Sequence, residues 1–247
     1  MARARRVVLG VTALPALVLA VLAVEIELAG RRSELQVPPL ALDGRVGDDS
    51  GQAIRVVWLG DSTAAGVGAS TVDAALPRLV AEGLGPPVEL TVLARSGATV
   101  AEVVAGQLPV VAELEPDVVF VSVGANDVTH LSSRADVERG YRRLVAGLPD
   151  RAEVVLLGVP DMGAIPRLAQ PLRAVAGWRG DRLDAIVREV ARDTGSVYVD
   201  IAGRTGPAFR ADPDRFFAAD EFHPSDAGYR RWSEAVLEVL RSTTIAP

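Results

Sequence analysis

Hydrophobic residues along the chain follow two patterns, which predict strands and helices in alternation. Short runs rich in valine, leucine and isoleucine predict strands at residues 54–59, 88–94, 118–123, 153–157 and 197–201. Mixed hydrophobic and polar stretches predict helices at residues 72–82, 99–114 and 134–146, before Gly195 and after Ser225. This alternation predicts an α/β fold with a doubly wound, parallel sheet of about five strands.

The first 24 residues carry a separate signal. Arg3, Arg5 and Arg6 precede an uncharged apolar run at residues 7–24. A basic start followed by such a run is typical of a signal peptide or an uncleaved signal anchor. We expect residues 1–24 to place the rest of the chain outside the cytoplasm, membrane-anchored or secreted.

The remainder divides into a linker and one domain. Residues 25–52 contain charges, Pro38-Pro39 and a cluster of glycine, aspartate and serine, which is typical of a linker. Residues 53–247 hold all the predicted strands and helices. A chain of 247 residues, of which 49% are hydrophobic, suits one globular domain with an appendage. We expect this domain to be a monomer.

Composition excludes several functions. The formal net charge of −6 argues against a nucleic-acid binder, which usually shows a basic face. Cysteine is absent, so a disulfide framework, a thiolate zinc site and a cysteine nucleophile are excluded. Only His130 and His223 can supply an imidazole. We expect His130, four residues after Asn126, to line a pocket or to lie at the surface.

Small or polar residues follow the first three predicted strands. Ser62, Gly97 and Asn126 come after the strands at 54–59, 88–94 and 118–123. Because ligands of open α/β sheets bind at the carboxyl ends of the strands, these three residues are candidates for one site. Each also has a plainer interpretation, since serine, glycine and asparagine are common turn and cap residues.

A possible base and its acid stand near the C-terminus. Asp220 precedes His223 by three residues, in a loop that enters the last predicted helix. A carboxylate at this spacing can accept the Nδ1–H of the ring and leave Nε2 free as a base. Ser62 would need such a base, because its hydroxyl is a weak nucleophile at neutral pH. The alternative is that Asp220 and His223 only cap the final helix.

Together these residues resemble the SGNH hydrolases, also called the GDSL esterase/lipase family. The matching blocks are Gly60-Asp61-Ser62-x-x-x-Gly66, a lone Gly97, Gly124-x-Asn126-Asp127 and Asp220-x-x-His223. The resemblance covers residues 54–242. It implies a flavodoxin-like three-layer α/β/α sandwich and hydrolysis of carboxylic esters without metal or cofactor.

The resemblance also implies roles for the site residues. Ser62 would be the nucleophile, His223 its base and Asp220 the acid that orients His223. The backbone N–H groups of Ser62 and Gly97 and the side-chain amide of Asn126 would form the oxyanion hole. Asp61 would be structural and hold the turn. The substrate would be a small-molecule, glycan or lipid ester. The segment 160–178, rich in proline, glycine and arginine, is expected either to face this substrate or to be a solvated connection.

Other functions remain open at this point. The same fold could be a non-catalytic module that binds the cell envelope or a carbohydrate. It could also be an acyltransferase or a deacetylase that acts on glycans. A metal-dependent phosphoesterase would use Asp61, Asn126, Asp127 and His223, but two histidines without metal-ligand spacing disfavour it.

Overall fold

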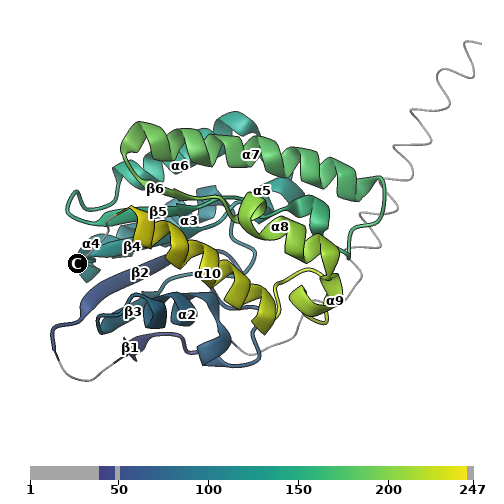
Figure 1. Cartoon of the computed structure of the whole chain (residues 1–247). Helices are drawn as coiled ribbons and strands as arrows, with labels where there is room; N and C mark the ends of the chain where they lie inside the picture. The colour runs from purple at the N-terminus through teal and green to yellow at the C-terminus, as the bar shows by residue number, and fades with distance from the viewer. Residues whose placement is uncertain (1–38, 48–50, 244–247) are drawn as a thin grey trace, which may run out of the picture.

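The computed structural model describes residues 39–47 and 51–243, and within them the chain forms a six-stranded sheet (Figure 1). The strands lie in the order β1-β3-β2-β4-β5-β6. β2 to β6 are parallel to one another, and β1 pairs antiparallel with β3 at one edge. The predicted α/β fold with five parallel strands is therefore confirmed. The strands are β1 Gly44–Val46, β2 Ile54–Gly60, β3 Val88–Val92, β4 Val118–Ser122, β5 Glu153–Leu157 and β6 Val197–Val199.

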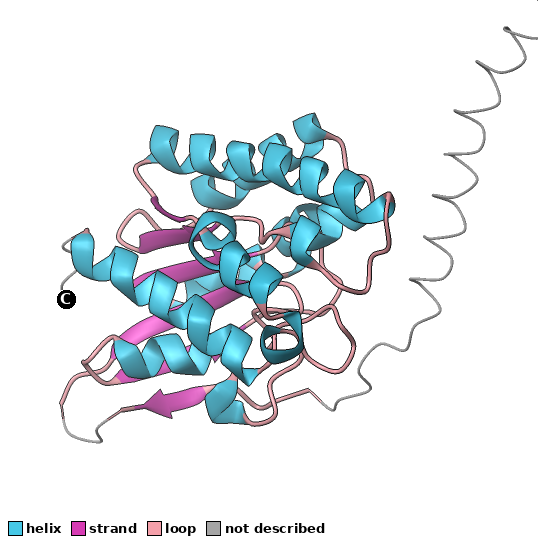
Figure 2. Cartoon of the chain, turned by 45° about the vertical axis from the view of Figure 1, so that its right-hand side comes forward, coloured by secondary structure: helices cyan, strands magenta, loops and turns pink. Residues whose placement is uncertain are grey.

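Helices cover both faces of this sheet, which makes the three-layer sandwich (Figure 2). On one face α10 packs against α2 and α8, and on the other α6 packs against α3 and α7. Between the layers Trp58 of β2 and Phe120 of β4 are fully buried and stack at 4.6 Å between ring centroids. The helices are α2 Leu76–Gly83, α3 Val100–Gly106, α4 Leu108–Leu114, α5 Ala125–Thr129, α6 Arg134–Ala146, α7 Leu172–Thr194, α8 Ile201–Ala211, α9 Pro213–Phe216 and α10 Asp226–Ser242.

The edge strand β1 was not predicted. It lies within residues 25–52, which the pattern assigned to a linker, and it pairs with β3 from Gly44 opposite Leu90 to Val46 opposite Val88. Leu42 and Val46 are buried in the hydrophobic core. The linker is therefore shorter than predicted. A strand of three residues is too short to show a hydrophobic alternation, so only the pairing with β3 reveals it.

Two predicted helices are interrupted near prolines. The helix predicted at 99–114 is divided into α3 and α4 at Gln107, and Pro109 lies in the first turn of α4. Proline lacks a backbone N–H and clashes with the preceding turn, so it cannot continue α3 but suits a helix start. The helix predicted at 72–82 begins instead as a short 3-10 turn, and Pro77 lies in the first turn of α2.

The region after β5 holds more helix than predicted. The strand predicted at 197–201 ends at Val199, because Asp200 caps α8 by accepting the N–H of Gly203. Neither α8 nor α9 was predicted. The segment 160–178 contains the short 3-10 helix η2, Met162–Ala164, and the first turns of α7.

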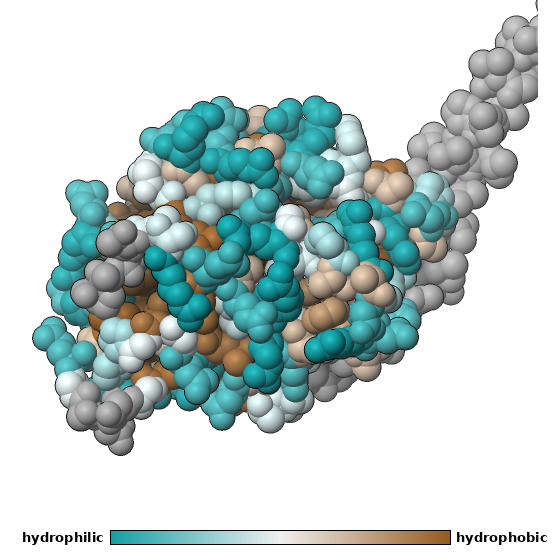
Figure 3. All heavy atoms as spheres, viewed as in Figure 1, coloured by the Kyte–Doolittle hydropathy of each residue, from teal (hydrophilic) through white to brown (hydrophobic). Residues whose placement is uncertain are grey.

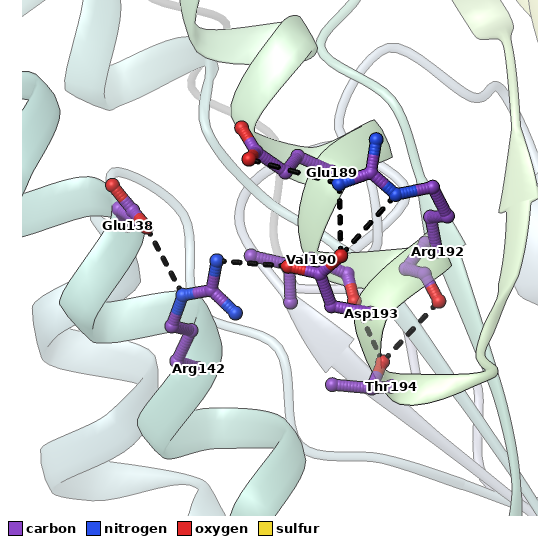
Figure 4. Close-up of polar contacts among 8 residues, drawn as sticks. Glu138, Arg142, Glu189, Val190, Arg192, Asp193 and Thr194 are labelled. Atoms are coloured by element: carbon purple, nitrogen blue, oxygen red, sulfur yellow. Dashed lines mark hydrogen bonds and ion pairs between the residues drawn. The ribbon is translucent and has the colours of Figure 1, made fainter.

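Exposed charged groups join the end of α7 to α6 (Figure 4). Arg142 donates to Glu138 on its own helix at 3.0 Å and to Asp193 of α7 at 3.1 Å. Hydrogen bonds from Arg192 and Arg142 hold the pKa of Asp193 below its ordinary value. Exposed pairs of this kind stabilise a protein little. In Figure 3 hydrophilic residues likewise cover α7 at the top of the molecule.

The predicted signal or anchor at residues 1–24 lies outside the residues that the structure describes, as does the linker up to residue 38. Among residues 39–47 and 51–243, no helix has both the length and the apolar character needed to span a membrane. The placement of the chain outside the cytoplasm stays a prediction.

Candidate active site

The turn after β2 presents Ser62 at the carboxyl edge of the sheet. Gly60, the last residue of β2, is fixed through both its backbone groups by the buried side chain of Gln107. Gln107 Oε1 accepts the Gly60 N–H and its Nε2 donates to the Gly60 carbonyl, each at 2.8 Å. An added Cβ at Gly60 would lie 2.0 Å from the carbonyl oxygen of Ser122, so only glycine fits there. Ser62 follows this turn and is 7% exposed.

Asp61 holds the same turn, as the sequence predicted. Its Oδ1 accepts the backbone N–H of Thr63 at 3.0 Å and the Thr63 hydroxyl at 2.9 Å. The Thr63 hydroxyl also bonds Ser122 Oγ at the end of β4. Burial raises the pKa of Asp61 to about 6, although the bonds from Thr63 and the nearby His223 oppose that rise. Through Thr63, Asp61 therefore connects the ends of β2 and β4, although burial makes the ionised form of its carboxyl unfavourable.

Ser62, His223 and Asp220 form one chain of hydrogen bonds. His223 Nε2 lies 2.9 Å from Ser62 Oγ, and His223 Nδ1 lies 2.6 Å from Asp220 Oδ2. The second oxygen, Asp220 Oδ1, accepts the backbone N–H groups of Phe222 and His223 at 3.0 Å each. Burial raises the pKa of Asp220, but the bond and charge of His223 outweigh burial and hold that pKa below its ordinary value.

The loop that carries His223 is itself tightly fixed. Phe217 and Pro224 form an isolated antiparallel bridge, and the Ala218 N–H donates to the His223 carbonyl at 2.8 Å. Ser225 then caps α10 by accepting the Gly228 N–H, as predicted. The alternative that Asp220 and His223 only cap the final helix is wrong, because Ser225 does so.

Residues 61–70 pack directly against the start of α10, which brings Ser62 and His223 together across 161 positions of the sequence. Tyr229 donates its hydroxyl to the carbonyl of Val67, and the Ser70 N–H donates to Asp226 at 2.7 Å. Gly68 has a φ of +99°, and an added Cβ would lie 2.3 Å from the carbonyl oxygen of Pro224. Glycine at this position therefore permits the close approach of the two loops.

The three predicted oxyanion donors lie on neighbouring loops. The backbone N–H groups of Ser62 and Gly97 donate to no other residue in the described part of the chain. Asn126, near the start of α5, donates its Nδ2 to the carbonyl of Ala98 at 3.0 Å, which joins its side chain to the Gly97 loop. Asn126 and Ser62 line the same pocket, whereas Gly97 is exposed beside it.

Asp127 and His130 lie apart from this chain of hydrogen bonds. Asp127 Oδ2 accepts the Val100 N–H at 3.0 Å, so it caps α3 and not its own helix. His130 ends α5 and is exposed. Within residues 39–47 and 51–243, no three histidine, aspartate or glutamate side chains form a group that could hold a metal ion. The residue set of the phosphoesterase alternative is thus not assembled.

A narrow pocket of about 40 Å³ opens beside Ser62 and His223. Its wall is largely apolar and comes from the segment 160–178, from α8, from the loop 217–224 that carries His223, and from Trp232 of α10. The apolar side chains are Met162, Ile165, Phe209, Phe217, Phe222 and Trp232. The predicted segment thus lines the pocket, together with α8, which sequence patterns missed.

The sequence pattern also did not identify Gln107 as a residue that supports the site. Glutamine within a predicted helix usually faces solvent, and its burial depends on the division of that helix into α3 and α4. Pro109, two residues later, was the one available signal of that division.

A serine hydroxyl hydrogen-bonded to an imidazole that a carboxylate orients, on an α/β/α sandwich, is the arrangement of a hydrolase. The chain belongs to the GDSL-like lipase/acylhydrolase family, whose model matches residues 58–231. The SGNH resemblance drawn from the sequence is confirmed.

Relatives agree with this assignment. The GDSL-like esterase Rv1075c of Mycobacterium tuberculosis is 34% identical over 195 residues, which are 76% of this chain and 62% of that protein. The lipase/acylhydrolase from Enterococcus faecalis superposes with a TM-score of 0.61 at 22% identity, over 77% of this chain and 96% of its own. Axe2, an acetylxylan esterase from Geobacillus stearothermophilus, superposes with a TM-score of 0.61 at 21% identity, over 78% of this chain and 96% of its own. The two structures share the fold.

Proposed function

We propose that this protein is a serine esterase that cleaves carboxylic esters through an acyl-enzyme on Ser62. The observation that carries the proposal is the pair of contacts at His223, 2.9 Å to Ser62 Oγ and 2.6 Å to Asp220. A base must lie within about 2.6–3.2 Å of the atom whose proton it removes. His223 Nε2 lies 2.9 Å from Ser62 Oγ.

The reaction takes two steps of the same kind. As Ser62 Oγ attacks the carbonyl carbon, its proton passes to His223 Nε2, and the imidazolium then protonates the departing alcohol oxygen. A water molecule next attacks the acyl-enzyme, gives its proton to His223, and releases the carboxylic acid and Ser62. Asp220 holds the ring and balances its positive charge.

The N–H groups of Ser62 and Gly97 and the amide of Asn126 would stabilise the tetrahedral oxyanion. Both backbone groups are free of other partners among the described residues, and the bond to Ala98 holds the Asn126 side chain in place. Removal of one such donor typically costs about 3–4 kcal/mol in the transition state.

We further propose a preference for short acyl groups. The pocket of about 40 Å³ beside Ser62 has room for only a few atoms. Its phenylalanine and tryptophan walls suit a methyl or ethyl group better than a polar one. The acetylxylan esterase among the structural neighbours agrees with this preference.

The test combines labelling and turnover. We expect a fluorophosphonate to label Ser62 in the wild type, and Ser62→Ala and His223→Ala to lose at least about a thousandfold in kcat on p-nitrophenyl acetate. Activity should fall from acetyl to octanoyl esters. Ser196→Ala, at the distant turn before β6, is the matched control and should retain wild-type activity.

Persistent labelling of Ser62→Ala would overturn the proposal. Inertness of the wild type toward the whole ester panel, together with retained glycan binding, would favour the non-catalytic module instead. A short-chain ester consumed only when a sugar acceptor is present would identify an acyltransferase.

A further inference from the structure

A second and larger cavity adjoins the ester pocket. This groove has a volume of about 510 Å³, within the range of about 300–1,000 Å³ typical of small-molecule sites. The first turns of α7 form one side, and the end of α8 and the start of α9 form the other, at the right of Figure 1. Its polar and aromatic side chains are Gln170, Arg173, Trp178, Asp181 and Arg210.

The groove is polar and carries side chains of both charges. Arg210 Nε donates to the buried Asp161 at 2.6 Å, and the nearby Asp181 adds a second negative charge. Arg173 donates to the carbonyls of Leu168 and Pro166, which fixes its guanidinium against the wall. The arginines supply hydrogen-bond donors and Asp181 supplies acceptors, so the groove suits a ligand that offers both acceptors and donors, such as one rich in hydroxyl groups.

Trp178 gives the groove a flat apolar surface. Trp178 is 57% exposed, whereas the other two tryptophans of the chain, Trp58 and Trp232, are buried. The Arg182 guanidinium lies 4.8 Å from its ring centroid and steadies the indole without burying it. A sugar ring has the matching chemistry, because one face carries C–H groups that pack on an aromatic ring and its rim carries hydroxyls.

The groove and the ester pocket share a wall. Ala164 of η2 lines both cavities, and Asp161 lines the ester pocket while it bonds Arg210 of the groove. A ligand that extends past η2 would therefore occupy both. The ester pocket is apolar and small, whereas the groove is polar and more than ten times as large, 510 against 40 Å³.

We propose that the groove binds the sugar part of an acylated glycan, so that the alcohol side of the ester is a sugar hydroxyl. This inference rests on the proposed esterase function and names its substrate class. The acyl C–O bond breaks, the acyl group passes to Ser62, and His223 returns its proton to the sugar oxygen, which leaves as a hydroxyl.

Direct binding is measured with inactive Ser62→Ala enzyme. Trp58 is buried away from both cavities, whereas Trp232 lines the ester pocket, so the signal of Trp178 is the part of the fluorescence change that its replacement removes. We expect acetylated xylotriose, acetylated cellotriose or an O-acetylated chitin trisaccharide to give a saturable change, the greater part of which is lost in Ser62→Ala/Trp178→Phe. No response to any of the three overturns the proposal, as does a response only to phosphatidylglycerol vesicles.

Kinetics separate the groove from the chemistry. Trp178→Ala should raise KM for the acetylated oligosaccharide by about tenfold and leave p-nitrophenyl acetate turnover unchanged, since the small aryl ester does not reach the groove. Val175→Ala is the matched control, because Val175 is an exposed apolar residue of α7 outside the groove. Equal losses on both substrates overturn the proposal.

The two proposals fail in distinguishable ways. A wild type that is inert toward p-nitrophenyl acetate and escapes fluorophosphonate labelling contradicts the esterase. The fluorescence titration does not depend on turnover, so it still decides whether the groove binds a glycan.

Discussion

At the scale of single residues, Asp220 performs two tasks with its two oxygens. Oδ1 accepts two backbone N–H groups and so fixes the loop, and Oδ2 accepts the ring of His223. The loop and the tautomer of the ring are therefore set by one side chain. The lowered pKa of Asp220 keeps this carboxylate ionised at neutral pH, so it can hold the Nδ1–H of His223.

Asp61 presents the opposite case, because its raised pKa makes the ionised form costly. The pKa rises from 3.8 to about 6, so the stability due to this carboxyl is complete below pH 3.8 and is lost as the pH rises through about 6. A change of that size corresponds to about 3 kcal/mol. Asp61→Asn retains an oxygen that accepts from Thr63 and carries no charge. We expect it to raise the free energy of unfolding at pH 7 by up to about 3 kcal/mol.

Urea denaturation at pH 4 and pH 7 measures this effect. Wild type and Asp61→Asn should differ little at pH 4 and clearly at pH 7. Asp73→Asn, whose carboxyl is 86% exposed, serves as the control and should change stability at neither pH. An Asp61→Asn variant that is less stable than the wild type at pH 7 would show that the charge of Asp61 stabilises the turn.

At the scale of elements, the division between α3 and α4 has a structural purpose. It turns Gln107 toward the end of β2, where its amide binds both backbone groups of Gly60. The Gly60 carbonyl has a second donor, the N–H of Arg95 at 3.1 Å, whereas Gln107 is the only described partner of the Gly60 N–H. The turn that carries Ser62 therefore depends on a side chain from a neighbouring helix.

We expect Gln107→Leu to lower the free energy of unfolding by about 1–3 kcal/mol, because it leaves the Gly60 N–H buried without a partner. It should also slow fluorophosphonate labelling of Ser62. Gln52→Leu, an exposed glutamine before β2, is the control and should leave both unchanged.

Gln107→Glu distinguishes a specific hydrogen bond from general packing. A protonated glutamic acid can accept from the Gly60 N–H and donate to its carbonyl, whereas the carboxylate can only accept. Burial raises the pKa of such a group, so its stabilisation is present at low pH and lost as the pH rises. We expect the urea concentration at the unfolding midpoint of this variant, relative to that of the wild type, to be lower at pH 7 than at pH 4. A pH-independent difference would contradict the hydrogen-bonding role.

At the scale of the whole molecule, the domain begins before its first predicted strand. Leu42 is 3% exposed in the hydrophobic core, and β1 closes one edge of the sheet. Leu42→Ala in the full chain should therefore lower the free energy of unfolding by about 2–5 kcal/mol, as for a core leucine. Leu131→Ala, at a leucine that is 66% exposed, is the control and should cost far less. Equal effects would place Leu42 in a linker.

The elements that the sequence predicted well are those specified by local patterns. The strand at 153–157 matches β5 residue for residue, and the end of α7 before Gly195 was predicted. β1, α8 and α9 were missed, because a three-residue strand and two short helices carry no clear period of their own. Their place depends on what they pack against.

The sequence by itself determined the order of strands and helices, the polar residues at the strand ends and the residue types of a possible Ser-His-Asp site. These follow from local hydrophobic periods and from the scarcity of histidine. Only the tertiary structure decided that His223 lies 2.9 Å from Ser62, that Gln107 fixes the turn, and that a polar groove adjoins the ester pocket. Each of these depends on contacts between loops far apart along the chain, and such contacts leave no periodic trace in the sequence.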